Sequence, residues 1–213
     1  MAQAGLSAIL LDSRSVADGR RMILALRAGT WFTQKCLMEW DARLFLSING
    51  LAGHWAWLDE LMRILSRPEN FFVSGLVALA YWYWKKGREA VLHAIILSLL
   101  IAGIDLLSFH IKGVIMRPRP CRVLEQTKKV VGCGKAYSFP SNHAVNTAAG
   151  AVYLQALYPK IGWFGWPIVL LIGFSRVYLG THYITDVLGG WLLGAAAAAG
   201  IFYLTRALRQ TQS

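Results

Sequence analysis

The sequence predicts an all-α membrane protein, a bundle of about five transmembrane helices preceded by N-terminal amphipathic helices at the membrane interface. Hydrophobic residues make up 56% of the 213 residues and charged residues only 15%, a balance that is too apolar for an ordinary soluble domain. The chain has nine tryptophans, and most of its basic residues lie between long apolar stretches, as expected where a chain meets lipid headgroups.

The formal net charge of +11 is compatible with nucleic acid or with anionic lipid as a partner. Because the basic residues are interrupted by apolar stretches, the pattern favours membrane lipids and an anionic substrate. No signature of a nucleic-acid-binding module is present, so we expect no nucleic-acid partner. Nothing in the sequence indicates an oligomeric state.

Residues 1–67 are expected to form surface and interfacial helices, and residues 68–213 the transmembrane core. Residues 1–40 mix basic and apolar residues and lack the uninterrupted apolar core of a signal peptide. In residues 40–67 the apolar side chains recur at helical spacing, which predicts an amphipathic helix at the interface or, alternatively, a soluble helix packed on the domain. Asn49-Gly50 predicts a turn ahead of it, and Pro68 ends it.

Five apolar segments follow, and each is predicted to be a helix within the membrane. They cover about residues 70–84, 89–109, 144–158, 161–179 and 186–204. Gly190 and Gly194 form a small-residue face that is expected to pack closely on another helix. With five alternating segments, the ends that carry the polar motifs fall on one side of the membrane.

The last two segments flank an arginine, a histidine and an aspartate. His182 and Asp186 are four residues apart, so a helix starting near Gly180 would place them on one face, where the carboxylate could orient the imidazole. Arg176 adds a planar cation suited to a phosphate group. On its own, this pair is also common as a helix-stabilising contact.

Two further clusters strengthen the chemical interpretation. Ser141 precedes a helical run of small residues, so it is a candidate N-cap, and the free N–H groups behind it would bind an anion. Asn142 and His143 follow it. Lys112 and Arg119 supply two more cations beyond another apolar segment.

Taken together, the patterns Lys-x6-Arg-Pro, Pro-Ser-Asn-His and Ser-Arg-x5-His-x3-Asp resemble those of the type-2 phosphatidic acid phosphatase family, which shares its site with vanadium haloperoxidases. The resemblance covers residues 112–186. Its integral-membrane lipid phosphatase branch matches the apolar segments. Asn142 departs from the glycine that is usual in the family.

The resemblance implies that His182 attacks phosphorus to give a phosphohistidine, that Asp186 orients it, and that His143 protonates the leaving oxygen and then activates water. It also implies a phosphate-binding set: Lys112, Arg119, Ser141, Asn142 and Arg176. The cations neutralise the phosphoryl oxygens, so no metal and no cofactor are expected.

Three alternatives use the same residues. In a zinc or iron hydrolase, His143, His182 and Asp186 would be ligands, although three nearby cations would repel a divalent ion. A haloperoxidase would hold vanadate, which the membrane segments disfavour. A lipid-binding or transport protein would only bind phosphate, and that would not require paired histidines.

The substrate and the location rest on the resemblance. The chain looks like bacterial undecaprenyl pyrophosphate phosphatases, with phosphatidylglycerophosphate, phosphatidic acid and lipid A 1-phosphate as alternative substrates. We expect a multi-pass protein of the bacterial inner membrane with its site on the periplasmic face, although most Lys and Arg residues fall on the catalytic side, which argues for the cytoplasm. Cys121 and Cys133 are expected either to pair or to remain free thiols.

Overall fold

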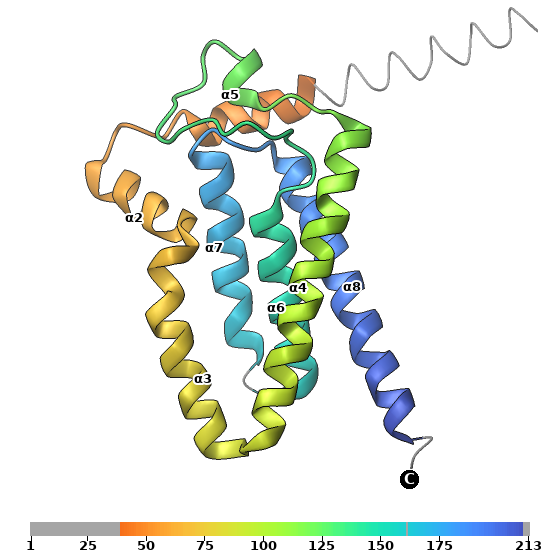
Figure 1. The fold of residues 1–213 in the computed structure, drawn as a ribbon. Coiled ribbons are helices and arrows are strands. Elements are labelled where there is room, and N and C mark those ends of the chain that lie inside the picture. Colours follow the sequence, from red (N-terminus) through yellow and green to blue (C-terminus); the bar gives the residue numbers. More distant parts are fainter. Residues whose placement is uncertain (1–38, 161, 211–213) are drawn as a thin grey trace, which may run out of the picture. The chain divides into compact units, whose positions relative to one another are not determined.

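A bundle of long helices, with shorter helices at one end, makes up the part of the chain that the structure describes, residues 39–160 and 162–210 of a computed structural model (Figure 1). All of its regular elements are helical, so the predicted all-α class is confirmed within those ranges. The chain divides into two units between Trp40 and Asp41, and the elements from α2 onward belong to Asp41–Ser213. Residues 39–49 are helical, and the remaining elements are α2 (Ala56–Ser66), η1 (Pro68–Phe71), α3 (Phe72–Lys86), α4 (Arg88–Ile115), α5 (Pro120–Val123), α6 (Asn142–Leu157), η2 (Gly162–Phe164), α7 (Gly165–Tyr178) and α8 (Ile184–Gln210).

The five long helices α3, α4, α6, α7 and α8 coincide with the five predicted apolar segments. Two stretches, Arg88–Val123 and Ile184–Leu208, are long and apolar enough to cross a membrane, so five transmembrane helices remain a prediction. Large apolar side chains point outward from these helices, including Leu99 at 68% and Leu192 at 73% exposure. Such a surface is unusual in water and fits a lipid environment.

The central contact of the bundle is between α6 and α8, where small residues let the two backbones approach. A Cβ added to Gly190 would lie 2.9 Å from the Ala144 Cβ and from the Ser141 carbonyl oxygen. One added to Gly194 would collide with the carbonyl of Val145. The predicted packing role of Gly190 and Gly194 is confirmed, and it seats the start of α8 against the start of α6.

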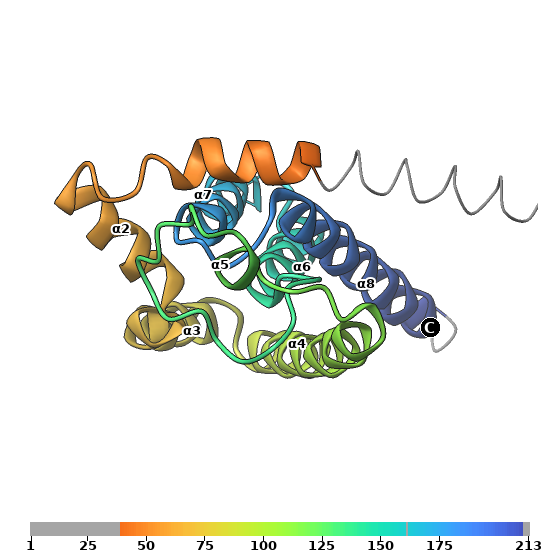
Figure 2. The same cartoon turned by 90° about the horizontal axis from the view of Figure 1, so that it is seen from above.

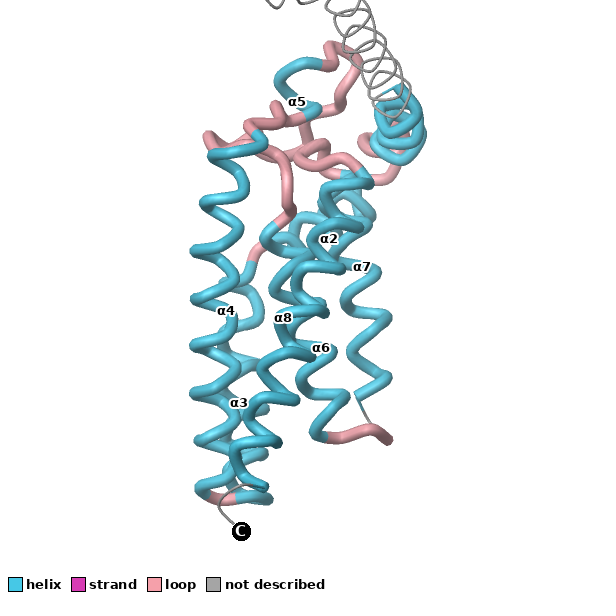
Figure 3. The backbone as a smooth tube through the Cα atoms, turned by 90° about the vertical axis from the view of Figure 1, so that its right-hand side faces the viewer, coloured by secondary structure: helices cyan, strands magenta, loops and turns pink. Residues whose placement is uncertain are grey.

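The other helices surround this pair. Figure 2, viewed along the bundle, shows α3 and α4 on one side and α7 on another, while Figure 3 shows the connecting loops gathered mainly at the two ends. Leu100 and Ile104 of α4 pack with Val145 and Tyr153 of α6 in the largest buried cluster. The long helices thus form a frame that fixes where their ends lie.

The N-terminal helical residues and α2 are tied to the end of α7. The predicted turn at Asn49-Gly50 and the predicted helix end before Pro68 are both confirmed. The buried Asn49 side chain donates to the Tyr178 carbonyl at 2.8 Å and accepts from the Lys128 amide at 2.8 Å. Asn49 therefore links the end of α7 to the loop that contains Lys128.

Candidate active site

The predicted site residues lie at one end of the bundle, where the C-terminal ends of α4 and α7 meet the N-terminal ends of α6 and α8 (Figure 1). This is the juxtaposition expected from alternating segments. The first N–H groups of α6 have no partner within the helix, which favours an anion there. At the start of α8, the Tyr183 and Thr185 amides instead donate to Asp186 and Asp41.

His182 and Asp186 are close, but not through the expected helix. α8 begins at Ile184, so the expectation of a helix from about Gly180 is wrong, and His182 lies in the loop before it. The loop turns because Asp186 Oδ2 accepts the Tyr183 amide at 2.8 Å, a contact that closes the first turn of α8. His182 Nδ1 then lies 3.6 Å from Asp186 Oδ2, closer to an ion-pair contact than to a normal hydrogen bond.

Arg117, which the sequence patterns did not single out, holds Asp186 in place. Its Nη1 donates to Asp186 Oδ1 at 2.7 Å, and its Nη2 donates to Asp41 Oδ2 at 2.6 Å. Ser138 donates its hydroxyl to Asp186 Oδ2. Because its two oxygens accept from different donors, the Asp186 carboxylate is held in one orientation. The Arg-Pro-Arg-Pro sequence at 117–120 could have pointed to Arg117, but only its second arginine, Arg119, matches the Lys-x6-Arg-Pro pattern.

The free nitrogen of His182 faces a guanidinium group. His182 Nε2 lies 3.4 Å from Arg119 Nη1, and since a guanidinium only donates, Nε2 is the acceptor and the ring proton sits on Nδ1, toward Asp186. Burial, with Arg119 and Arg176 adding to it, lowers the pKa of His182 to about 3. The imidazole is therefore neutral at physiological pH, with an unprotonated nitrogen beside a cation, as a nucleophile toward phosphorus requires.

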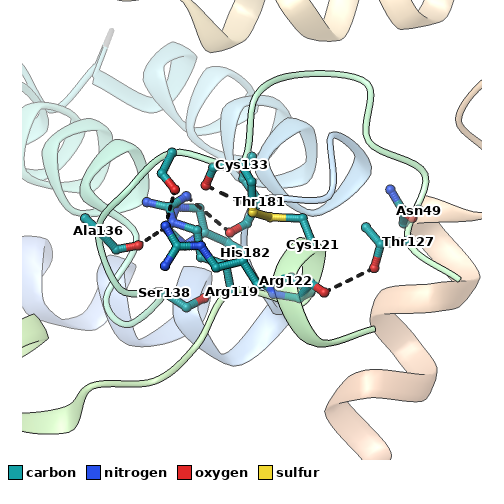
Figure 4. The surroundings of a disulfide bond; sticks show 12 residues. Asn49, Arg119, Cys121, Arg122, Thr127, Cys133, Ala136, Ser138, Thr181 and His182 are labelled. Carbon is teal, nitrogen blue, oxygen red and sulfur yellow. Dashed lines mark hydrogen bonds between the residues drawn. A yellow bond between two sulfur atoms is a disulfide. The ribbon is translucent and has the colours of Figure 1, made fainter. Parts of the chain in front are cut away.

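The loop that carries Arg119 is closed by a disulfide. Cys121 and Cys133 are bonded with their Cα atoms 6.0 Å apart, which decides the alternative left open by the sequence (Figure 4). Arg119 also donates from Nε to the Ala136 carbonyl at 2.8 Å, on the far side of the same loop. The guanidinium is thus positioned by the loop that the disulfide closes.

The N-terminus of α6 offers unused donors. Ser141 is the N-cap residue as predicted, but its hydroxyl makes no cap bond and is buried without a partner. Asn142 donates its side-chain amide to Asp105 Oδ1 at 2.7 Å, which leaves its backbone N–H as its contribution to an anion site. A buried, unpartnered hydroxyl at a helix N-terminus is suited to a phosphoryl oxygen.

Ser66, at the end of α2, contacts two predicted site residues. His143 Nε2 lies 3.0 Å from the Ser66 carbonyl oxygen, and because that oxygen only accepts, Nε2 carries the proton. Arg176 donates from Nη1 to the Ser66 hydroxyl, while its Nε is buried without a partner. No sequence pattern pointed to Ser66.

Lys112 is buried and donates to the carbonyl of Pro140, at the start of the Ser141 segment. Lys112, Arg119 and Arg176, hereafter the site cations, therefore all face the loops around His182. Asp105 forms no salt bridge within 4 Å with any of these three cations. It accepts instead from Asn142 and Asn146.

Comparison with known proteins adds an independent finding. The model of the PAP2 superfamily matches residues 90–210, a range that contains all the predicted site residues. A lipid A 4'-phosphatase of Porphyromonas gingivalis is 29% identical over 167 residues, covering 74% of this chain and 70% of that protein. The undecaprenyl-diphosphatase BcrC of Bacillus subtilis is 33% identical over 172 residues, covering 78% and 84%. The crystal structure of a transmembrane PAP2-type phosphatidylglycerolphosphate phosphatase from Bacillus subtilis superposes with a TM-score of 0.62 at 23% identity, covering 90% of this chain and 95% of that one.

Proposed function

The chain belongs to the PAP2 superfamily of lipid phosphatases, and from this premise we propose that it hydrolyses lipid phosphates or pyrophosphates without a metal, through a phosphohistidine on His182. The observation that carries the proposal is the environment of His182. One ring nitrogen faces Asp186 at 3.6 Å, and the other is an unprotonated acceptor beside Arg119. A neutral imidazole held between a carboxylate and a cation is oriented for attack on an anionic phosphate.

In the first step, the lone pair of His182 Nε2 forms a bond to phosphorus while the bond from phosphorus to the lipid oxygen breaks. His143, protonated on both ring nitrogens when the phosphate is bound, gives one proton to the leaving oxygen and becomes neutral. In the second step, His143 removes a proton from water, the water oxygen bonds to phosphorus, and the phosphorus–nitrogen bond breaks. Inorganic phosphate leaves, and both histidines return to their initial states.

The site cations and the Ser141 hydroxyl would stabilise the charge that develops on the phosphoryl oxygens. Lys112 and Arg176 are buried and Arg119 is half-buried, so three cations are available for three oxygens. Ser141 Oγ and Arg176 Nε are buried without a partner and can donate as well. Electrostatic stabilisation of this kind supplies most of the catalysis in phosphoryl transfer. It is the reason that we propose a reaction without a metal ion.

Trapping of the intermediate tests this function. Wild-type protein mixed with labelled lipid phosphate and rapidly quenched in base is expected to retain the label as a phosphoenzyme, and exposure to acid should release it. His182→Ala should form none and show no turnover, and His143→Ala should lose about 10²- to 10⁴-fold in rate. His110→Ala, which changes an exposed histidine of α4, is the matched control and should keep full activity. Turnover by the His182→Ala protein would refute the mechanism.

The protein resides in a membrane, as its family, its two long apolar helices and its exposed apolar surface support. We propose the bacterial inner membrane, with the site on the outer face. The disulfide fits an oxidising compartment and supports that side. The test is labelling with a membrane-impermeant thiol reagent at Lys129→Cys, on the loop near the site, and at Lys86→Cys, at the turn between α3 and α4, with Cys36 replaced and the disulfide kept. Labelling in intact spheroplasts at position 86 alone would reverse the assignment.

We propose that the substrate is one of several membrane lipid phosphates, which together form a panel for assay. Undecaprenyl pyrophosphate is the substrate first expected from the sequence, and a relative named undecaprenyl-diphosphatase supports it. A relative named phosphatidylglycerophosphatase B supports phosphatidylglycerophosphate, and one named lipid A 4'-phosphatase supports a lipid A phosphate, although at the 4' position rather than the 1 position. Release of inorganic phosphate from each lipid, solubilised in the same detergent, ranks them.

A further inference from the structure

A cavity of about 540 Å³ opens beside His143, between α2, α4, α6 and α7. Besides His143, four polar side chains line it from two helices: Asp105 from α4, and Asn142, Asn146 and Thr147 from α6. Apolar residues of α2 and α7 complete the wall. The cavity is therefore an apolar space, of a size suited to a lipid headgroup, with one polar cluster placed next to the proposed general acid.

The cluster is short of hydrogen-bond donors. Asp105 Oδ1 accepts from Asn142 at 2.7 Å and from Asn146 at 3.2 Å, while Oδ2 has only a 3.3 Å contact with the same Asn146 amide. Asn146 Oδ1 is buried and has no partner. A carboxylate can accept about four hydrogen bonds, so acceptor sites remain on both residues. A buried acceptor without a donor is unfavourable, and a bound ligand with a hydroxyl would satisfy it.

The position of the cluster decides which part of a substrate it meets. The proposed role of His143 is to protonate the oxygen that leaves with the lipid, so the atoms next to that oxygen lie on the His143 side of the site. Asn142 is adjacent to His143 in the chain and is already bonded to Asp105. The cavity is thus placed to receive the alcohol portion of the substrate, and the site cations receive the phosphate.

We infer that Asp105 and Asn146 form a specificity site that binds a free hydroxyl on the leaving lipid alcohol, close to the phosphoester. The inference rests on the proposed phosphatase function. It favours phosphate monoesters of hydroxylated headgroups, such as phosphatidylglycerophosphate. It disfavours phosphatidate, whose alcohol has no free hydroxyl. It also disfavours polyprenyl diphosphates, whose leaving group is an anionic phosphate that would meet the carboxylate. This changes the order of the panel, in which undecaprenyl pyrophosphate came first.

The test compares three lipids in the same detergent: phosphatidylglycerophosphate, phosphatidate with the same acyl chains, and farnesyl diphosphate. The measured quantity is the ratio of kcat/KM for phosphatidylglycerophosphate to that for phosphatidate. Asp105→Asn preserves the shape of the side chain but replaces one of the two acceptor oxygens by an NH2 donor and removes the negative charge. It should lower the ratio about 10- to 100-fold, the loss expected for one hydrogen bond to a carboxylate.

Asn146→Ala is a second variant that should lower the same ratio. Thr147→Val is the matched control in the same cavity, because the Thr147 hydroxyl already bonds to the His143 carbonyl within its own helix, and it should leave the ratio unchanged. A merely structural role of Asp105 would lower the rates on all three lipids and leave the ratio as it was, which would overturn the inference. A wild-type protein without preference for the hydroxylated lipid would overturn it too, while leaving the phosphatase function standing. Failure to hydrolyse any of the three lipids would overturn both.

Discussion

The Arg117 network offers the sharpest test of how the site is held. Arg117 is 19% exposed at its side chain, whereas its partners Asp41 and Asp186 are at 1% and 0%. It also donates to Thr185 Oγ1 at 2.6 Å. Replacing Arg117 by alanine would leave two buried carboxylates facing each other without a cation.

Removing one partner of a buried ion pair typically costs about 3–5 kcal/mol, because the remaining charge stays buried and unpaired. For a chain of this length, each kcal/mol shifts the melting temperature by about 2–4 °C, so Arg117→Ala should lower it by about 6–20 °C. Arg117→Lys should recover only part of the loss, since an ammonium group cannot reach both carboxylates with a planar fork.

The assay is thermal unfolding of the purified protein in detergent, followed together with the rate of phosphate release. Arg63→Ala is the matched control, because it removes an arginine from an ion pair with Glu60 whose side chains are 37% and 58% exposed. Such a pair is worth about 0–1 kcal/mol. Equal melting temperatures for Arg117→Ala and Arg63→Ala would refute the idea that Arg117 holds Asp186 in place.

Three further predictions concern the chemistry of the site. Activity should survive excess chelator and be inhibited by vanadate; loss on chelation with recovery on adding zinc would support a metal hydrolase instead. Because the pKa of His182 is about 3 in the folded protein and about 6.5 when unfolded, only the unfolded chain gains this proton between those values. The free energy of unfolding therefore decreases as the pH falls below 6.5, by up to about 1.4 kcal/mol per pH unit. The melting temperature of His182→Gln should depend less on pH than that of the wild type. Parallel curves would contradict a neutral, buried His182. Reduction of the Cys121–Cys133 disulfide should destabilise the protein by about 2–4 kcal/mol. It should also lower kcat, because Arg119 is held by this loop. Unchanged kinetics in reductant would show that the loop keeps its shape without the disulfide.

The sequence by itself determined the helical class and the residues that carry chemistry. Long apolar runs can be satisfied in lipid only by helices that bond their own backbone, so the five long helices follow from composition and spacing. The basic and histidine motifs at their ends follow from the chemistry of phosphate, which needs cations and a neutral nucleophile. The close helix contact at Gly190 was also predictable from the sequence, because small residues four apart on one helix face allow two helix backbones to approach.

Tertiary structure alone decided how these residues are held. Asp41 and Ser66 lie far from the site in sequence, and no local pattern marks them, yet they contact Arg117, His143 and Arg176. Asp105 lies in an apolar helix, and its partners Asn142 and Asn146 come from another helix about 40 residues further along the chain. Contacts of this kind depend on the packing of several helices at once. Whether two groups form a hydrogen bond depends on a few tenths of an ångström in the distance between them, and the periodicity of a sequence cannot specify positions so finely.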